Sequence, residues 1–154
     1  MPAPDRTRSL RAGLMLGVAG MAAVDEVVFH QLLAWHAFYD RSTPDVALLS
    51  DGLLQTAYLA LLVAGFFGYA DLRRRDAVAR RSLLAALLTG AGAFQLFDGL
   101  VDHKVLRLHQ VRAGVPDLLA YDLAWNGAAL ALLAVGLLLV RRSRDEGAPA
   151  RTDR

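Results

Sequence analysis

The sequence predicts an all-α integral membrane protein, a four-helix bundle made of two tandem two-helix repeats. Three observations predict it: long stretches without charged residues, basic residues confined to a few loops, and a polar motif that occurs twice. The chain has 154 residues, is 55% hydrophobic and has a mean hydropathy of +0.35, which is high for a soluble domain of this size. A soluble bundle would need a polar face on each helix, and residues 59–67 and 130–140 are apolar all round.

Four stretches contain no Asp, Glu, Lys, Arg or His and mark the expected helices. They are residues 12–24, 52–70, 82–97 and 123–140. At about 1.5 Å per residue the second and fourth stretches cover roughly 27–28 Å, close to the thickness of a bilayer core. The first and third stretches reach that length only by extending into segments that carry Asp and His. Polar side chains are therefore expected within the membrane in these two helices.

The expected helices include residues that flank these stretches. They run over residues 11–39, 44–70, 80–109 and 115–142. Pro44 and Pro116 lie close to the starts of the second and fourth helices, where proline is tolerated. We expect a single transmembrane domain over residues 11–142, with repeats at 11–72 and 80–142. The remaining residues, 1–10 and 143–154, are expected to form two polar tails.

Basic residues predict how the helices are oriented. Thirteen of the seventeen Lys and Arg residues precede the first helix, lie between the second and third, or follow the fourth. The other four are Arg41, Lys104, Arg107 and Arg112. The positive-inside rule therefore predicts a multi-pass protein of the cell membrane with both termini in the cytoplasm. Topology accounts for the arginine-rich loops, so no nucleic-acid partner is predicted.

A polar motif of the form D-x4-H-x5-H occurs twice, at a shift of 73 positions. The first copy is formed by Asp25, His30 and His36, and the second by Asp98, His103 and His109. A shift of 71 positions relates a further pair in the next helix of each copy, Asp51 with Gln55 and Asp122 with Asn126. Agreement of rare polar residues inside apolar helices favours tandem duplication. Because each copy contains two helices, the pseudo-twofold axis is expected to lie along the membrane normal.

The repeated residues all lie near the outer ends of their helices, so we expect them to form one polar layer. Ionisable side chains inside a membrane are costly and usually face the bundle interior or pair with one another. Imidazole and carboxylate donors together suit a divalent transition metal such as zinc, iron, manganese or copper, and the absence of cysteine excludes thiolate ligands. The expected ligands are Asp25, His30, His36, Asp98, Asp102, His103 and His109. The residues expected to orient them are Glu26, Asp51, Gln55, Asp122 and Asn126.

The spacing within the motif does not suit a regular helix. Asp25 and His36 are eleven residues apart and share a face, whereas His30 lies about 140° around the helix from Asp25. Either the first and third helices unwind near their outer ends, or His30 and His103 have a second role. The spacing leaves both possibilities open.

Other functions fit the same residues. Histidines of the first and third helices could be paired axial ligands of haem, although the neighbouring carboxylates argue against an apolar haem pocket. A proton relay, a small transporter, an accessory or assembly subunit of a membrane complex, and a purely structural polar cluster are further possibilities. Beyond the lipid bilayer, the partner is either a second copy of the chain or an unidentified membrane complex. No nucleophile motif, phosphate loop or dinucleotide fingerprint is present, so the sequence supports no particular enzymatic activity. A metal with an open coordination position would allow hydrolysis or redox chemistry, and the sequence leaves this open.

Residues 28–36, 97–112 and 121–125 resemble DUF2243, a family of bacterial predicted membrane proteins of unknown function. The resemblance covers about residues 12–142. It implies a four-helix membrane protein that carries these His and Asp positions, and it implies no established activity. In that family a second histidine often follows the last histidine of each motif. This chain has Ala37 and Gln110 there, which implies a site with fewer donors.

Overall fold

The computed structural model describes residues 3–146, and within this range it is entirely helical apart from the connecting segments. Its long helices are α1 (Arg6–Val24), α2 (Pro44–Arg74), α3 (Arg80–Phe97) and α4 (Leu119–Arg142). Two π-helices, η1 (Asp25–Leu32) and η2 (Asp98–Val105), continue α1 and α3 without a break. The resulting four helical units are each long and apolar enough to cross a membrane. The predicted all-α class with four long apolar helices is confirmed.

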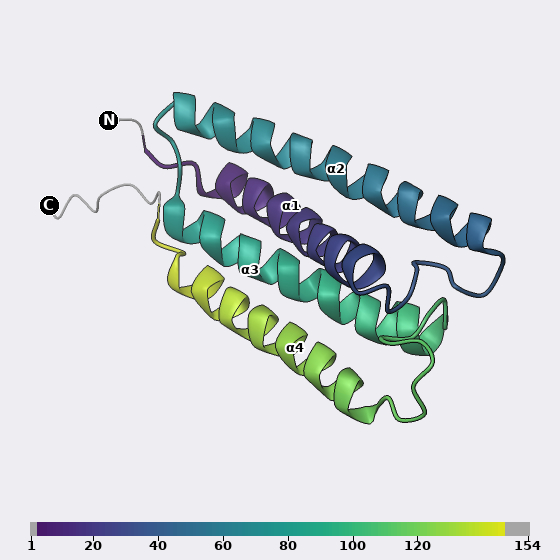
Figure 1. Cartoon of the computed structure of the whole chain (residues 1–154). Helices are drawn as coiled ribbons and strands as arrows, with labels where there is room; N and C mark the ends of the chain where they lie inside the picture. The colour runs from purple at the N-terminus through teal and green to yellow at the C-terminus, as the bar shows by residue number, and fades with distance from the viewer. Residues whose placement is uncertain (1–2, 147–154) are drawn as a thin grey trace, which may run out of the picture.

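The four helices lie side by side in the order α2, α1, α3, α4, so α1 and α3 form the centre (Figure 1). Glycines allow these two helices to approach closely. A Cβ atom on Gly90 would lie 2.5 Å from the Leu14 carbonyl oxygen, and one on Gly17 would overlap the Leu87 carbonyl oxygen. The outer helices expose large apolar side chains, for example Phe67 on α2 and Leu123 on α4. This arrangement suits a bundle surrounded by lipid.

At the end of the bundle where α1 begins and α4 ends (Figure 1), polar contacts join the helices. Asp5 caps α1 through its side chain, so that helix begins before the expected residue 11. The Arg6 guanidinium donates to the Ser143 carbonyl oxygen at 3.1 Å, and a Glu146 carboxylate oxygen accepts from the Ser82 backbone N–H at 2.8 Å. The described parts of both predicted tails therefore pack on the bundle. The rest of these tails, residues 1–2 and 147–154, lies outside the described residues.

The opposite end of the bundle differs more from expectation. The first and third helical units end at Leu32 and Val105, whereas residues 39 and 109 were predicted. The cause lies in the backbone, because Ala34 and Arg107 have φ angles of 48° and 54°, in the left-handed region that cannot continue a right-handed helix. The segments that follow are free to fold as loops across this end of the bundle. The fourth helix likewise begins at Leu119 and not at residue 115.

Candidate metal centre

The two π-helices begin at the aspartates of the two motifs, Asp25 and Asp98. A π-helix is widened to i→i+5 hydrogen bonds, so residues five apart share a face that they would not share on an α-helix. His30 Nε2 consequently lies 3.4 Å from a carboxylate oxygen of Asp25, and His103 Nε2 lies 3.1 Å from one of Asp98. On a regular α-helix His30 would point away from Asp25. The structure brings the two residues together because the helix departs from α-helical geometry near its outer end, which is the first of the two possibilities given above.

The loops that follow the π-helices place the second histidine of each motif. The His36 Nδ1–H donates to the Val111 carbonyl oxygen at 2.9 Å, and the His109 Nδ1–H donates to the Phe38 carbonyl oxygen at 2.8 Å. Each loop therefore holds the histidine of the other loop. Because a carbonyl can only accept, Nδ1 carries the proton and Nε2 keeps its lone pair. Two backbone hydrogen bonds also join the loops, from Asp40 N to Leu108 O and from Ala113 N to Trp35 O.

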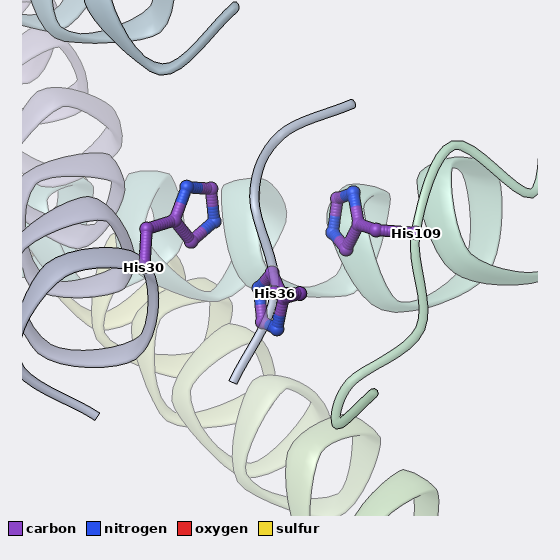
Figure 2. A group of neighbouring side chains, drawn as sticks. All are labelled: His30, His36 and His109. Atoms are coloured by element: carbon purple, nitrogen blue, oxygen red, sulfur yellow. The ribbon is translucent and has the colours of Figure 1, made fainter. Parts of the chain in front are cut away.

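The four imidazoles form one cluster at this end of the bundle. His36 and His109 stack with their ring centroids 4.5 Å apart and their planes within 7°. His30 lies 4.6 Å from His36, and His103 lies 4.6 Å from His109, between ring centroids. Figure 2 shows His30, His36 and His109 approaching one another from separate segments of the chain. The motif carboxylates complete the cluster, with 3.9 Å from Asp25 to His36 Nε2 and 3.4 Å from Asp98 to His109 Nε2.

These polar groups are buried without being satisfied. The four histidines are at most 6% exposed, and Asp25 and Asp98 at most 2%. The Nε2 atoms of all four histidines lack a hydrogen-bond partner among the described residues. Buried polar atoms in folded proteins are nearly always paired, so lone pairs left in this state mark a place for a cation. Donor atoms within 4.8 Å of one another form three groups: His30 with His36 and His109, Asp98 with His103 and His109, and Glu26 with His30 and Asp51.

Carboxylates outside the motif orient His30. Its Nδ1 lies 2.9 Å from a Glu26 carboxylate oxygen and 3.1 Å from one of Asp51. Glu26 also accepts from the Gln31 side-chain amide at 2.9 Å, and Asp51 accepts from the Phe38 backbone N–H at 2.7 Å. A carboxylate on the far nitrogen of an imidazole strengthens the imidazole as a metal ligand. Glu26 and Asp51 therefore occupy the positions that an orienting role requires.

The other residues named from the sequence lie less directly against the imidazoles. Asp122 pairs with Lys104 at 2.6 Å, and the Asn126 side-chain amide donates to the Asp122 carbonyl oxygen. Gln55 and Asp102 make no hydrogen bond or ion pair with a histidine within residues 3–146, although Asp102 is only 7% exposed. The structure thus brings six of the seven expected ligands into one cluster and leaves Asp102 beside it.

Burial and charge act differently on the two loop histidines. Burial, together with the positive charge that a protonated His109 would carry nearby, lowers the pKa of His36 to about 3. Burial also disfavours the charged form of His109, but the closer Asp98 carboxylate outweighs it and raises the pKa of His109. A neutral His36 presents a free lone pair at physiological pH, as metal binding requires.

Aromatic side chains separate the cluster from the lipid. Phe29, Trp35, Tyr121 and Trp125 line an apolar pocket of about 400 Å³ between α1 and α4. The ring of Trp125 lies 6.1 Å from that of His103, between centroids. The Arg112 guanidinium lies 5.1 Å from the Trp35 ring centroid, which favours a cation–π contact at the pocket. The cluster is thus bordered on this side by an apolar, largely aromatic surface.

Sequence reasoning missed the backbone carbonyls of Phe38 and Val111, which fix two of the imidazoles. It also missed Gln31, which orients Glu26. The reciprocal carbonyl contacts arise from tertiary packing of two loops, and no residue type marks them. The π-helices did leave a signal, because D-x4-H is the i,i+5 spacing that a π-helix places on one face.

Comparison with known proteins identifies the family. The family described as "Predicted membrane protein (DUF2243)" matches residues 12–143. The chain belongs to DUF2243. No curated protein and no solved structure matches it. As a DUF2243 member the protein is a predicted membrane protein, in agreement with its four candidate spans, and the family description names no activity.

Proposed function

We propose that this DUF2243 protein binds divalent transition-metal ions in the cluster formed by the two D-x4-H-x5-H motifs. The observation that carries the proposal is the set of four buried Nε2 atoms without partners, two of which are held in position by Nδ1–H donation to a carbonyl. Separations of 3.1–3.9 Å between these nitrogens and the motif carboxylates suit donors that share one ion at metal–ligand distances of about 2.1 Å. With nitrogen and oxygen donors alone, zinc, iron, manganese and copper(II) are the candidates.

The geometry gives no support to haem as the ligand. Two axial imidazoles must approach the iron from opposite faces of a flat macrocycle. His36 and His109 instead stack directly on each other at 4.5 Å, which leaves no space for a porphyrin between them. The donor atoms lie within 4.8 Å of one another in groups of three, which suits a small metal ion.

We further propose that the metal centre lies at the extracytoplasmic end of the bundle, with both termini in the cytoplasm. The distribution of basic residues supports this orientation. Because the chain has no cysteine, single cysteines introduced at the exposed positions Arg41 and Arg144 can be labelled with a membrane-impermeant reagent in intact cells. Labelling at position 41 alone is expected, and labelling at position 144 alone would show that the orientation is the reverse.

The metal proposal is tested by elemental analysis of detergent-purified protein saturated with Zn²⁺ or Mn²⁺ and then freed of excess ion. Stoichiometric metal is expected in the wild type, with a reduced metal content in His36→Ala and His109→Ala. Glu146→Gln at the other end of the bundle is the control and should retain the wild-type content. Absence of stoichiometric metal from the folded, saturated wild type would rule out the proposal.

A further inference from the structure

We infer that the site holds two ions, one on each D-x4-H-x5-H motif, and that each ion has two histidines and one aspartate as its protein ligands. The inference rests on the proposed metal binding and adds to it the number of ions and their ligands. It follows from the shape of the cluster, from the way each carboxylate faces the imidazoles, and from the charge that must be balanced.

The cluster is too elongated for one ion to reach every imidazole. The rings follow one another in the order His30, His36, His109, His103, with centroid separations of 4.6, 4.5 and 4.6 Å. Non-consecutive rings, His30 with His109 and His36 with His103, are 5.9 Å apart. This separation is between ring centroids, whereas the donor atoms of a single ion must lie within about 4.2 Å of one another, twice a typical bond length. The donor nitrogens of His30, His36 and His109 lie within 4.8 Å of one another. Among the described residues, no group of mutually close donors contains both end histidines, His30 and His103.

Each aspartate presents its two oxygens to the two imidazoles of its own motif. Asp98 Oδ2 lies 3.1 Å from His103 Nε2, and Oδ1 lies 3.4 Å from His109 Nε2. Asp25 does the same with His30 and His36, at 3.4 and 3.9 Å. Two histidines and one carboxylate are a common ligand set for iron(II) and for zinc, and this set leaves at least one coordination position open. Each motif therefore supplies a half-site of its own. The group of His30, His36 and His109, which spans both motifs, is the single-ion alternative that the variants below distinguish.

Charge also favours two ions. Asp25, Glu26 and Asp98 are at most 2% exposed. Asp51, which contacts His30, has a side chain that is 17% exposed. No Lys or Arg forms an ion pair with these four carboxylates within residues 3–146. Asp102, which is 7% exposed, adds a fifth carboxylate beside the cluster. Uncompensated negative charges are very costly in a buried site. One divalent ion would balance two of these five charges, whereas two divalent ions balance four.

The number of ions per chain is the direct test. Metal-free protein in detergent is titrated with Mn²⁺, and bound metal is measured by elemental analysis against protein concentration from amino-acid analysis. Two ions per chain are expected. One ion per chain at saturation would overturn this inference and leave the proposed metal binding intact, whereas no bound ion would overturn both.

Matched variants distinguish two half-sites from one shared site. His30→Gln removes a ligand from the first motif, and His103→Gln removes its counterpart from the second. Each variant is expected to retain one ion per chain, and loss of all metal in either folded variant would contradict the inference. A measurement without variants gives the same decision, because two neighbouring Mn²⁺ ions produce an exchange-coupled electron paramagnetic resonance spectrum. An isolated six-line spectrum at full occupancy would indicate a single ion.

Discussion

The two motifs have the same ligand residues but very different surroundings. His30 of the first motif has carboxylates of Glu26 and Asp51 against its Nδ1. His103 of the second motif has no partner for its Nδ1 among the described residues. At a shift of 73 positions Glu26 corresponds to Gly99, and Asp122, the counterpart of Asp51, is paired with Lys104. The first half of the site thus has two carboxylates against the Nδ1 atom of its first histidine, and the second half has none there.

This contrast separates what binding an ion requires from what tunes it. The residues that would contact metal, together with the π-helix and the left-handed residue that position them, occur in both halves at the same spacing. The residues around them differ. Because carboxylates behind an imidazole raise its affinity for metal, we expect the first motif to bind its ion more tightly than the second. Two-step metal titration would show this order directly.

The largest effect is expected where the two halves are most alike. His36→Ala and His109→Ala each remove a donor and a contact between the loops. Each should weaken binding of the ion on its own motif by more than about 100-fold, beyond the range for residues that only orient a ligand. Isothermal titration calorimetry of both variants measures the loss. If one variant bound metal with the affinity of the wild type, the histidine of that loop would not be a metal ligand, which would contradict the prediction.

A smaller effect is expected from Glu26→Gln, which removes a charge behind His30. Affinity for the tighter ion should fall by about 10- to 100-fold, while the weaker ion is unaffected. Isothermal titration calorimetry resolves the two steps. Gln31→Leu, which removes only the residue that orients Glu26, should have a weaker effect of the same kind. An equal loss at both steps would show that the halves are not separate.

In the second half, Gly99 occupies the position that corresponds to Glu26, and a larger side chain there would collide with α4. The variant Gly99→Ala tests this steric requirement. A Cβ atom at this position would lie 2.5 Å from Asn126 Oδ1 and 2.7 Å from Trp125 Cδ1, so we expect destabilisation of about 1–3 kcal/mol. Gly127→Ala is the matched control, since nothing lies within 4 Å of its Cβ position. Thermal unfolding in detergent compares the two variants. Equal stability would mean that Gly99 is not required by packing.

The smallest effect is expected from Lys104→Gln, which breaks the ion pair with Asp122. The Lys104 side chain is 38% exposed, so the gain in cation affinity at the second motif should be only a few-fold, corresponding to about 0.5–1 kcal/mol. Arg41→Gln on the loop before α2 is the control and should change nothing. A decrease in affinity would show that the ion pair supports the site structurally.

Much of the fold could be predicted from the sequence, because stretches such as residues 52–70 have no charged residue and only a membrane helix accounts for them. The candidate ligands could be predicted for a related reason, since histidines and aspartates are rare inside apolar helices and here fall in one register. The helix ends could not be predicted. Ala34 and Arg107 adopt left-handed backbone angles with no glycine to indicate them.

The arrangement of the ligands was also beyond the sequence. The prediction placed Asp25 and His30 around a regular α-helix. In the π-helix the hydrogen bonds run from residue i to i+5, so residues five apart lie closer to one face than on an α-helix. The pairing of His36 with Val111, and of His109 with Phe38, depends on two loops crossing at the end of the bundle. Such contacts are set by tertiary packing, which single residue types do not encode.

X-ray absorption spectroscopy of the Zn²⁺-loaded protein tests the central claim most directly, namely that imidazoles of both motifs bind metal. We predict nitrogen and oxygen neighbours at about 2.0–2.1 Å with the multiple-scattering pattern of about two imidazoles per ion, reduced in His36→Ala and in His109→Ala alike. Bound zinc whose spectrum lacks imidazole scattering, or whose spectrum is unchanged in both variants, would contradict the account.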